Sequence, residues 1–102
     1  MANADTDDND MTVTAAEPEL IGSWITNAGN TLYLLARRGT AYASIWLARD
    51  PEPARIGRVK RAGQQVRSIE WDEPWSDQAA AWKDAQRAQV ATALARWESV
   101  SV

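Results

Sequence analysis

The feature that most constrains the fold is a change in the spacing of apolar residues near residue 75 of the 102-residue chain. From Leu20 to Trp71, apolar residues alternate with other residues in short runs, which is typical of strands. From Trp75 to Trp97 they recur every three or four residues, which is the spacing along one face of a helix. A chain of this length has room for one core. We therefore expect a single α+β domain over residues 20–102.

Turn signals divide the alternating region into separate strands. The segment 27–30, Gly39 and Gly63 carry residues that favour turns, and Pro51 and Pro53 exclude a central strand between them. The pattern predicts an antiparallel β-meander of four to five strands followed by one long C-terminal α-helix packed on the sheet. The expected strands are about 20–26, 31–38, 41–48, 55–61 and 64–71, and the expected helix is about 76–98.

Two sets of apolar residues are expected to form the core. On the helix, the stripe is Trp75, Ala79, Trp82, Gln86, Val90, Ala93 and Trp97, widened by Leu94. A stripe of this kind normally packs on a sheet. On the first three strands, the alternation assigns one face to Ile21, Ser23, Ile25, Leu32, Leu34, Ala36, Ala43, Ile45 and Leu47.

The opposite face of these strands is rich in aromatic residues and is the first candidate site. In the expected register Trp24, Tyr33 and Trp46 form one row across three strands. Such a row exceeds what cross-strand stabilisation requires. The candidate partner-binding residues are Trp24, Tyr33, Arg37, Tyr42 and Trp46. The row could also stack on unpaired bases, or be covered by the helix or a second subunit.

The second candidate site is a basic hairpin. Its members are Arg55, Arg58, Lys60, Arg61 and Arg67. Guanidinium groups suit phosphate and carboxylate geometry, so the hairpin is a candidate for binding anions or nucleic acid. The alternative is a charged edge that prevents pairing with other strands. A turn at Ala62-Gly63 would place Arg58 opposite Arg67, a like-charge pair that costs stability.

Residues 1–19 are expected to be a disordered acidic arm. They carry six acidic residues and no basic one, and they lack aromatic residues and sustained periodicity. The run that starts at Asp5 begins like a calcium loop, but Asp10 stands where that loop needs glycine and Ala16 where it needs glutamate. The sequence therefore predicts no metal site.

The residue types argue against an enzyme. The chain contains no His and no Cys, which removes the commonest general base, transition-metal ligands and thiol chemistry. Glu70, Asp72 and Glu73 cluster in sequence, but nothing nearby completes an acid–base site. We expect no cofactor. A cytoplasmic location is expected, since there is neither a secretory signal nor a membrane-spanning stretch.

The leading functional hypothesis is therefore a small non-enzymatic binding protein. Trp, Tyr and Arg are enriched at binding hot spots, and another protein is the expected partner. A regulatory or inhibitory role fits best, of the phage or bacterial accessory-gene inhibitor, antitoxin or immunity type. The alternative is a nucleic-acid-binding protein that uses the basic sheet, with the acidic arm competing for that surface. A homodimer is compatible with either hypothesis.

Overall fold

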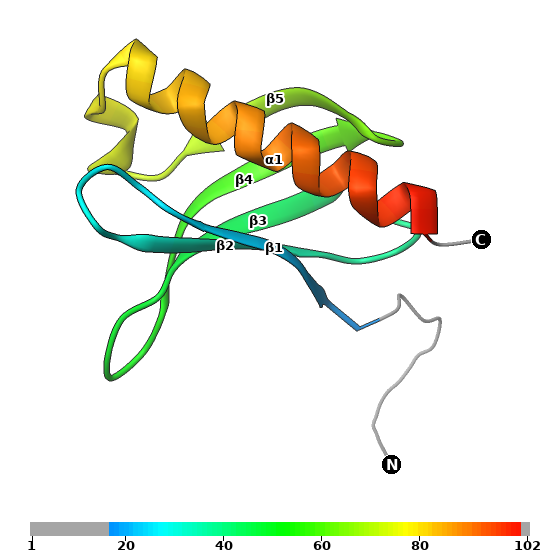
Figure 1. Cartoon of the computed structure of the whole chain (residues 1–102), viewed down its shortest axis with the longest axis horizontal. Helices are drawn as coiled ribbons and strands as arrows, with labels where there is room; N and C mark the ends of the chain where they lie inside the picture. Colours follow the sequence, from blue (N-terminus) through cyan, green and yellow to red (C-terminus); the bar gives the residue numbers. More distant parts are fainter. Residues whose placement is uncertain (1–16, 101–102) are drawn as a thin grey trace.

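A computed structural model describes residues 17–100 of the chain as five strands followed by a helix (Figure 1). The strands are β1 (Glu19–Ile25), β2 (Thr31–Ala36), β3 (Tyr42–Leu47), β4 (Ala54–Ala62) and β5 (Gln65–Trp71). A short 3₁₀ helix, η1 (Trp75–Asp77), precedes the long helix α1 (Ala80–Val100). The α+β prediction of an antiparallel meander followed by one C-terminal helix is confirmed. Most of the acidic arm, residues 1–16, lies outside the described residues.

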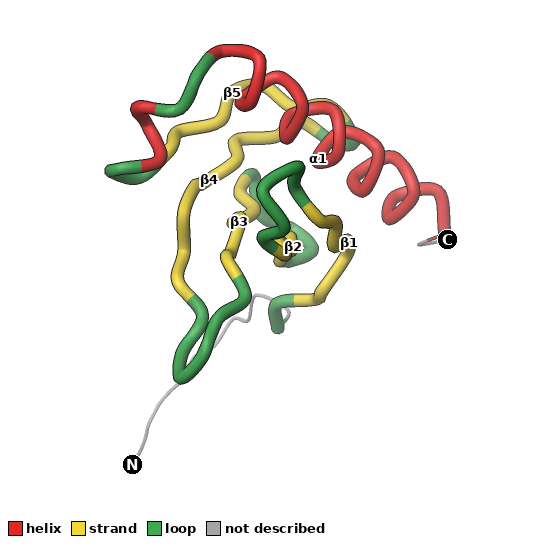
Figure 2. Tube along the Cα trace, turned by 60° about the vertical axis from the view of Figure 1, so that its left-hand side comes forward, coloured by secondary structure: helices red, strands yellow, loops and turns green. Residues whose placement is uncertain are grey.

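The sheet is a simple meander in the order β1-β2-β3-β4-β5, and every neighbouring pair is antiparallel. Figure 2 shows that the sheet curves strongly and that α1 runs along its concave side. The helix contacts both edge strands, β1 and β5. Register shifts in three of the four strand pairs contribute to this curvature, because an inserted residue bends its strand and increases its twist.

The core lies between the concave side of the sheet and α1. Its fully buried members are Leu32, Leu34, Ile45, Ile56, Val59, Val90 and Leu94. The register of β2 and β3 is as expected: Leu34 lies opposite Ile45, and Tyr33 lies opposite Trp46. The expected core residues of β2 are therefore confirmed, and Ala43 and Ile45 of β3 are buried with them.

The expected face of β1 is wrong for residues 23–25. Ile21 packs against the core as expected, because the register shift between Leu20 and Gly22 restores the expected facing there. Trp24 lies opposite Leu32, and Ser23 lies opposite Tyr33, so Trp24 is on the core side. Ile25, expected in the core, is 71% exposed. The reason is the length of the connection, because residues 26–30 form a five-residue loop that moves the pairing by one position. A one-residue slip turns every side chain of a strand to the other face.

The expected register of the second hairpin is also wrong. Its turn is Gly63-Gln64, and a further shift follows between Lys60 and Arg61. Arg58 therefore lies opposite Glu70 and not opposite Arg67. The predicted like-charge pair is absent, and a carboxylate faces the guanidinium group. Gly63, with φ at +60°, provides the left-handed conformation that this tight turn requires.

The helix begins four residues later than expected. Gln78 has an extended backbone with ψ at 153°, and this separates η1 from α1. Trp75 therefore folds back on the first turns of the helix, where its ring stacks on Trp82 at 5.8 Å between centroids. Trp71 meets the same ring edge-on at 5.1 Å. This cluster of three indoles covers one end of the core, so packing outweighs helix propensity at residues 76–79.

Within residues 17–100, no helix is long and apolar enough to cross a membrane.

Candidate functional site: the helix-free face of the sheet

The face of the sheet that points away from α1, here called the outer face, is not covered by another described helix or strand (Figure 2). The register places its residues in rows across the strands. One row holds Ser23, Tyr33 and Trp46, and the next holds Leu20, Leu35, Ser44, Arg58 and Glu70. A third row holds Tyr42, Lys60 and Ser68. The face is thus mainly apolar over β1–β3 and charged over β4 and β5.

The large hydrophobic residues that the fold leaves exposed gather on this face. Leu20 is 65% exposed, Ile25 71% and Tyr42 49%, and the strand register puts all three on the outer side. Half-buried Tyr33, Leu35 and Trp46 lie between them. Single exposed apolar residues are ordinary on a protein surface. A contiguous group rimmed by polar residues is characteristic of an interaction surface.

An open depression of about 390 Å³ crosses one end of the outer face. Leu35, Ser44 and Trp46 form part of its lining, with Pro18, Arg37 and Arg58 among the residues around it. The Trp46 indole is held in place, since its Nε1 donates a hydrogen bond to Ser44 Oγ at 2.8 Å. The Tyr33 ring lies nearly parallel to it, at 6.5 Å between centroids. The aromatic pair is thereby pre-oriented.

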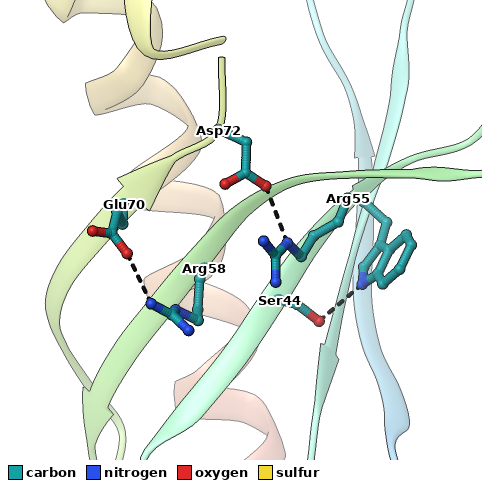
Figure 3. Close-up of polar contacts among 6 residues, drawn as sticks. Ser44, Arg55, Arg58, Glu70 and Asp72 are labelled. Atoms are coloured by element: carbon teal, nitrogen blue, oxygen red, sulfur yellow. Dashed lines mark hydrogen bonds and ion pairs between the residues drawn. The ribbon is translucent and has the colours of Figure 1, made fainter. Parts of the chain in front are cut away.

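The charged half of the outer face is organised by ion pairs between β4 and the end of β5 (Figure 3). Arg58 Nη2 lies 2.9 Å from Glu70 Oε1, and Arg55 Nε lies 3.0 Å from Asp72 Oδ2. The Arg58 guanidinium also lies over the Tyr42 ring, 5.4 Å from its centroid. Exposed pairs of this kind contribute about 0–1 kcal/mol each to stability. Arg58 contacts both Tyr42 on β3 and Glu70 on β5, and so links the two halves of the face.

Four of the five aromatic-face candidates lie together as predicted. Tyr33, Tyr42 and Trp46 are on the outer face, and Arg37 lines the depression beside them. Trp24 does not belong with them. Its indole Nε1 donates to Gln86 Oε1 of α1 at 2.8 Å, so it joins the sheet to the helix.

The basic hairpin is divided between the two faces. Arg55, Arg58 and Lys60 belong to the outer face, while Arg61 points to the core side and is only 8% exposed. There its guanidinium lies 4.9 Å from the centre of the Trp97 ring. Arg67 is exposed at the position that the register shift leaves without a partner residue on β4. The five residues therefore do not form one basic surface.

Several residues of the outer face were missed by reasoning from the sequence. Leu20 was expected in the first strand without a role in binding, and Ile25 was expected in the core. Glu70 and Asp72 were noted only as carboxylates that complete no acid–base site. The alternation of β4 and β5, with Arg58 and Glu70 both at outward positions, could have indicated the ion pair. Nothing in the sequence indicates the one-residue shift that exposes Ile25.

A first prediction separates Trp24 from Trp46. Trp24→Phe is expected to lower the free energy of unfolding by about 1–2 kcal/mol, because it leaves the buried Gln86 amide oxygen without its indole donor. Trp46→Phe is the matched control and is expected to change stability by about 0.5 kcal/mol or less, since its hydrogen bond to Ser44 is on the uncovered face. Urea denaturation followed by far-UV circular dichroism measures both. Equal losses in the two variants would contradict the assignment.

The described residues contain no group of three acidic side chains placed to hold a metal ion. Comparison with known proteins adds no assignment, because no protein-family model matches the chain and neither a curated protein nor a solved structure is significantly similar to it. Function is therefore inferred from the geometry of the outer face.

Proposed function

We propose that this chain is a non-enzymatic binding protein that docks on another protein through its outer face, in a regulatory or inhibitory role. The observation that supports this most directly is the position of Leu20, Ile25 and Tyr42, three exposed large hydrophobic residues on one uncovered side of the sheet. Antiparallel sheets commonly leave one face in water, but that face is then polar. Here it is mainly apolar over β1–β3 and charged over β4 and β5.

The chemistry of the face fits a protein partner. Its centre is a pre-oriented Tyr33–Trp46 pair beside Leu35, and its rim carries Arg55 and Arg58. Tyr, Trp and Arg are the residues that contribute most at protein interfaces, usually from a central position surrounded by a polar rim. A side chain inserted by the partner into the depression beside Trp46 would be largely removed from water.

The same geometry favours nucleic acid less. Arg61 lies on the core side, and both Arg55 and Arg58 are paired with carboxylates. A phosphate backbone would have to displace Asp72 and Glu70 to reach these guanidinium groups. Counterion release, which supplies most non-specific affinity for nucleic acid, depends on basic groups that are free to contact phosphates.

The second prediction tests the face directly. Immobilised wild-type protein is used to capture a partner from a lysate of the source cells, and the purified partner is then titrated against variants. Trp46→Ala and Leu35→Asp are each expected to raise the dissociation constant about 30-fold or more, since hot-spot residues contribute about 2 kcal/mol or more to binding. The matched control is Ala88→Asp, which places the same charge on the exposed side of α1.

Thermal unfolding of each variant verifies that the fold is retained. If Trp46→Ala and Leu35→Asp bind the partner as tightly as the wild type does, the outer face is not the docking surface. If the captured partner is a nucleic acid, shown by loss of capture after nuclease treatment and by a steep salt dependence, the protein-binding proposal is overturned in favour of the alternative.

A further inference from the structure

The outer face carries basic groups that the described residues do not neutralise. Arg58 and Arg55 have carboxylate partners. By contrast, Arg37 and Lys60 have no ion pair with any carboxylate in the described part of the chain. Arg37 lines the depression, and Lys60 lies opposite Tyr42 in the neighbouring strand. Tyr42, on the strand between these two cations, lines the depression together with Arg37.

The chain itself contains a segment of complementary chemistry that enters the fold at this place. Pro18 lines the depression, so residues 1–16 join the fold at its edge. They carry four aspartates, at positions 5, 7, 8 and 10, and no basic side chain. Met11 and Val13 lie between the acidic run and Pro18. Apolar residues near the entry point followed by acidic ones match a face that is apolar near β1–β3 and basic toward β4.

The lengths are also compatible. Neighbouring strands lie about 4.8 Å apart, so Lys60 on β4 is about 14 Å from the line of β1. The eight residue-to-residue steps from Asp10 to Pro18 span up to about 26 Å when extended. The aspartates can therefore reach Arg37 and Lys60 without any change in the sheet, and Met11 and Val13 can lie over the depression on the way.

We propose that residues 1–16 dock in cis on the outer face, with Asp5–Asp10 against Arg37 and Lys60, and act as a built-in competitor for the partner of that face. The regulatory part of this inference rests on the proposed function, while docking itself does not. The aspartates are attracted only weakly to these exposed cations, and salt screens the attraction. Such a segment reduces binding to weak or incorrect partners and yields to a partner with a larger apolar contact.

The absence of cysteine makes a direct test practical in the full chain. A nitroxide spin label is attached at Ala4→Cys, and the loss of amide signal is measured by NMR against the reduced label. We expect the amides of Tyr42, Ser44 and Lys60 to lose about half or more of their intensity at low salt, and this loss to disappear at 1 M salt, where the screening length is about 3 Å. The amides of Ala88 and Thr92, on the exposed side of α1, are the internal control.

Two further samples identify the occupant. Changing Asp5, Asp7, Asp8 and Asp10 to Asn is expected to abolish the signal loss on the outer face while leaving the fold unchanged. Mixing spin-labelled protein with isotope-labelled protein that carries no spin label is expected to produce no loss of amide signal. Docking would be overturned if the amides of the outer face and of α1 lost signal equally, or if the signal loss on the outer face persisted in the Asn variant. Signal loss in the mixed sample would assign the contact to a second copy of the chain.

The regulatory part is measured separately. The Asn variant is expected to bind the captured partner about threefold or more tightly at low salt, because the competing charge is removed. If the wild type shows signal loss on the outer face but the Asn variant binds the partner no more tightly, docking is retained and competition with the partner is overturned. If the partner does not bind through the outer face at all, the proposed function is overturned, but the spin-label result for docking still stands.

Discussion

Replacing Trp97 by alanine is expected to lower the free energy of unfolding by about 3–5 kcal/mol. The side chain is only 6% exposed at the C-terminal part of α1. The guanidinium groups of Arg38 and Arg61 both lie over its ring, at 4.6 and 4.9 Å from the centroid. Its Nε1 also donates to Glu19 Oε1 at 3.0 Å. The substitution removes a large buried volume and the face on which both cations lie.

This loss is expected to be a large fraction of the total free energy of unfolding, since a domain of this size has about 5–15 kcal/mol of stability. Urea denaturation followed by far-UV circular dichroism gives the value. Trp97→Phe is the control: it retains an aromatic face but removes the hydrogen bond to Glu19, and we expect it to cost about 1–2 kcal/mol. A Trp97→Ala variant within about 0.5 kcal/mol of the wild type would show that this cluster does not hold the helix to the sheet.

The second large effect is expected at a close approach of β1 and α1. A Cβ atom at Gly22 would lie 2.8 Å from Ala93 Cβ, a distance at which one element must move. Gly22→Ala is therefore expected to destabilise the protein by about 1–3 kcal/mol, the usual cost of overpacking. Ser23→Ala, at the exposed neighbouring position, is the control and is expected to change stability by about 0.5 kcal/mol or less.

A double-mutant cycle tests the cause of that loss. Ala93→Gly alone is expected to cost about 1 kcal/mol or more, because glycine is a poor helix former. Combined with Gly22→Ala it is expected to recover part of the stability, giving an interaction energy that departs from additivity in the stabilising direction. Additive losses in the double variant would mean that the contact between Gly22 and Ala93 is not the reason for the effect.

The segments of the fold were predictable from local patterns. Turn residues and proline mark where each strand ends, and the three-to-four spacing of Val90, Ala93, Leu94 and Trp97 identifies the buried stripe of α1. All four are buried as expected. The pairing of β2 with β3 was also predictable, because either expected turn at Arg38–Thr40 gives the same side-chain parity. Tyr33 and Trp46 consequently lie opposite each other as expected.

The candidate site was only partly predictable, and the errors share one physical cause. One extra residue in the loop before β2 turns Trp24 toward α1 and exposes Ile25. In the second hairpin, the turn at Gly63-Gln64 and the extra residue Arg67 on β5 together place Glu70, and not Arg67, opposite Arg58. A strand repeats every two residues, so a single inserted residue exchanges its two faces. Local composition carries almost no information about such shifts.

The sequence alone determined the kinds of residue available for binding: aromatic residues and arginines, without His or Cys. It also determined the order of strands and helix, because both follow from periodicity within short segments. The tertiary structure decided that the aromatic strands and part of the basic hairpin form one outer face, joined where Arg58 lies over Tyr42. It also decided that Arg61 and Trp24 belong to the core side. These outcomes depend on pairing between segments far apart in the chain, where register and helix packing select the face that each side chain occupies.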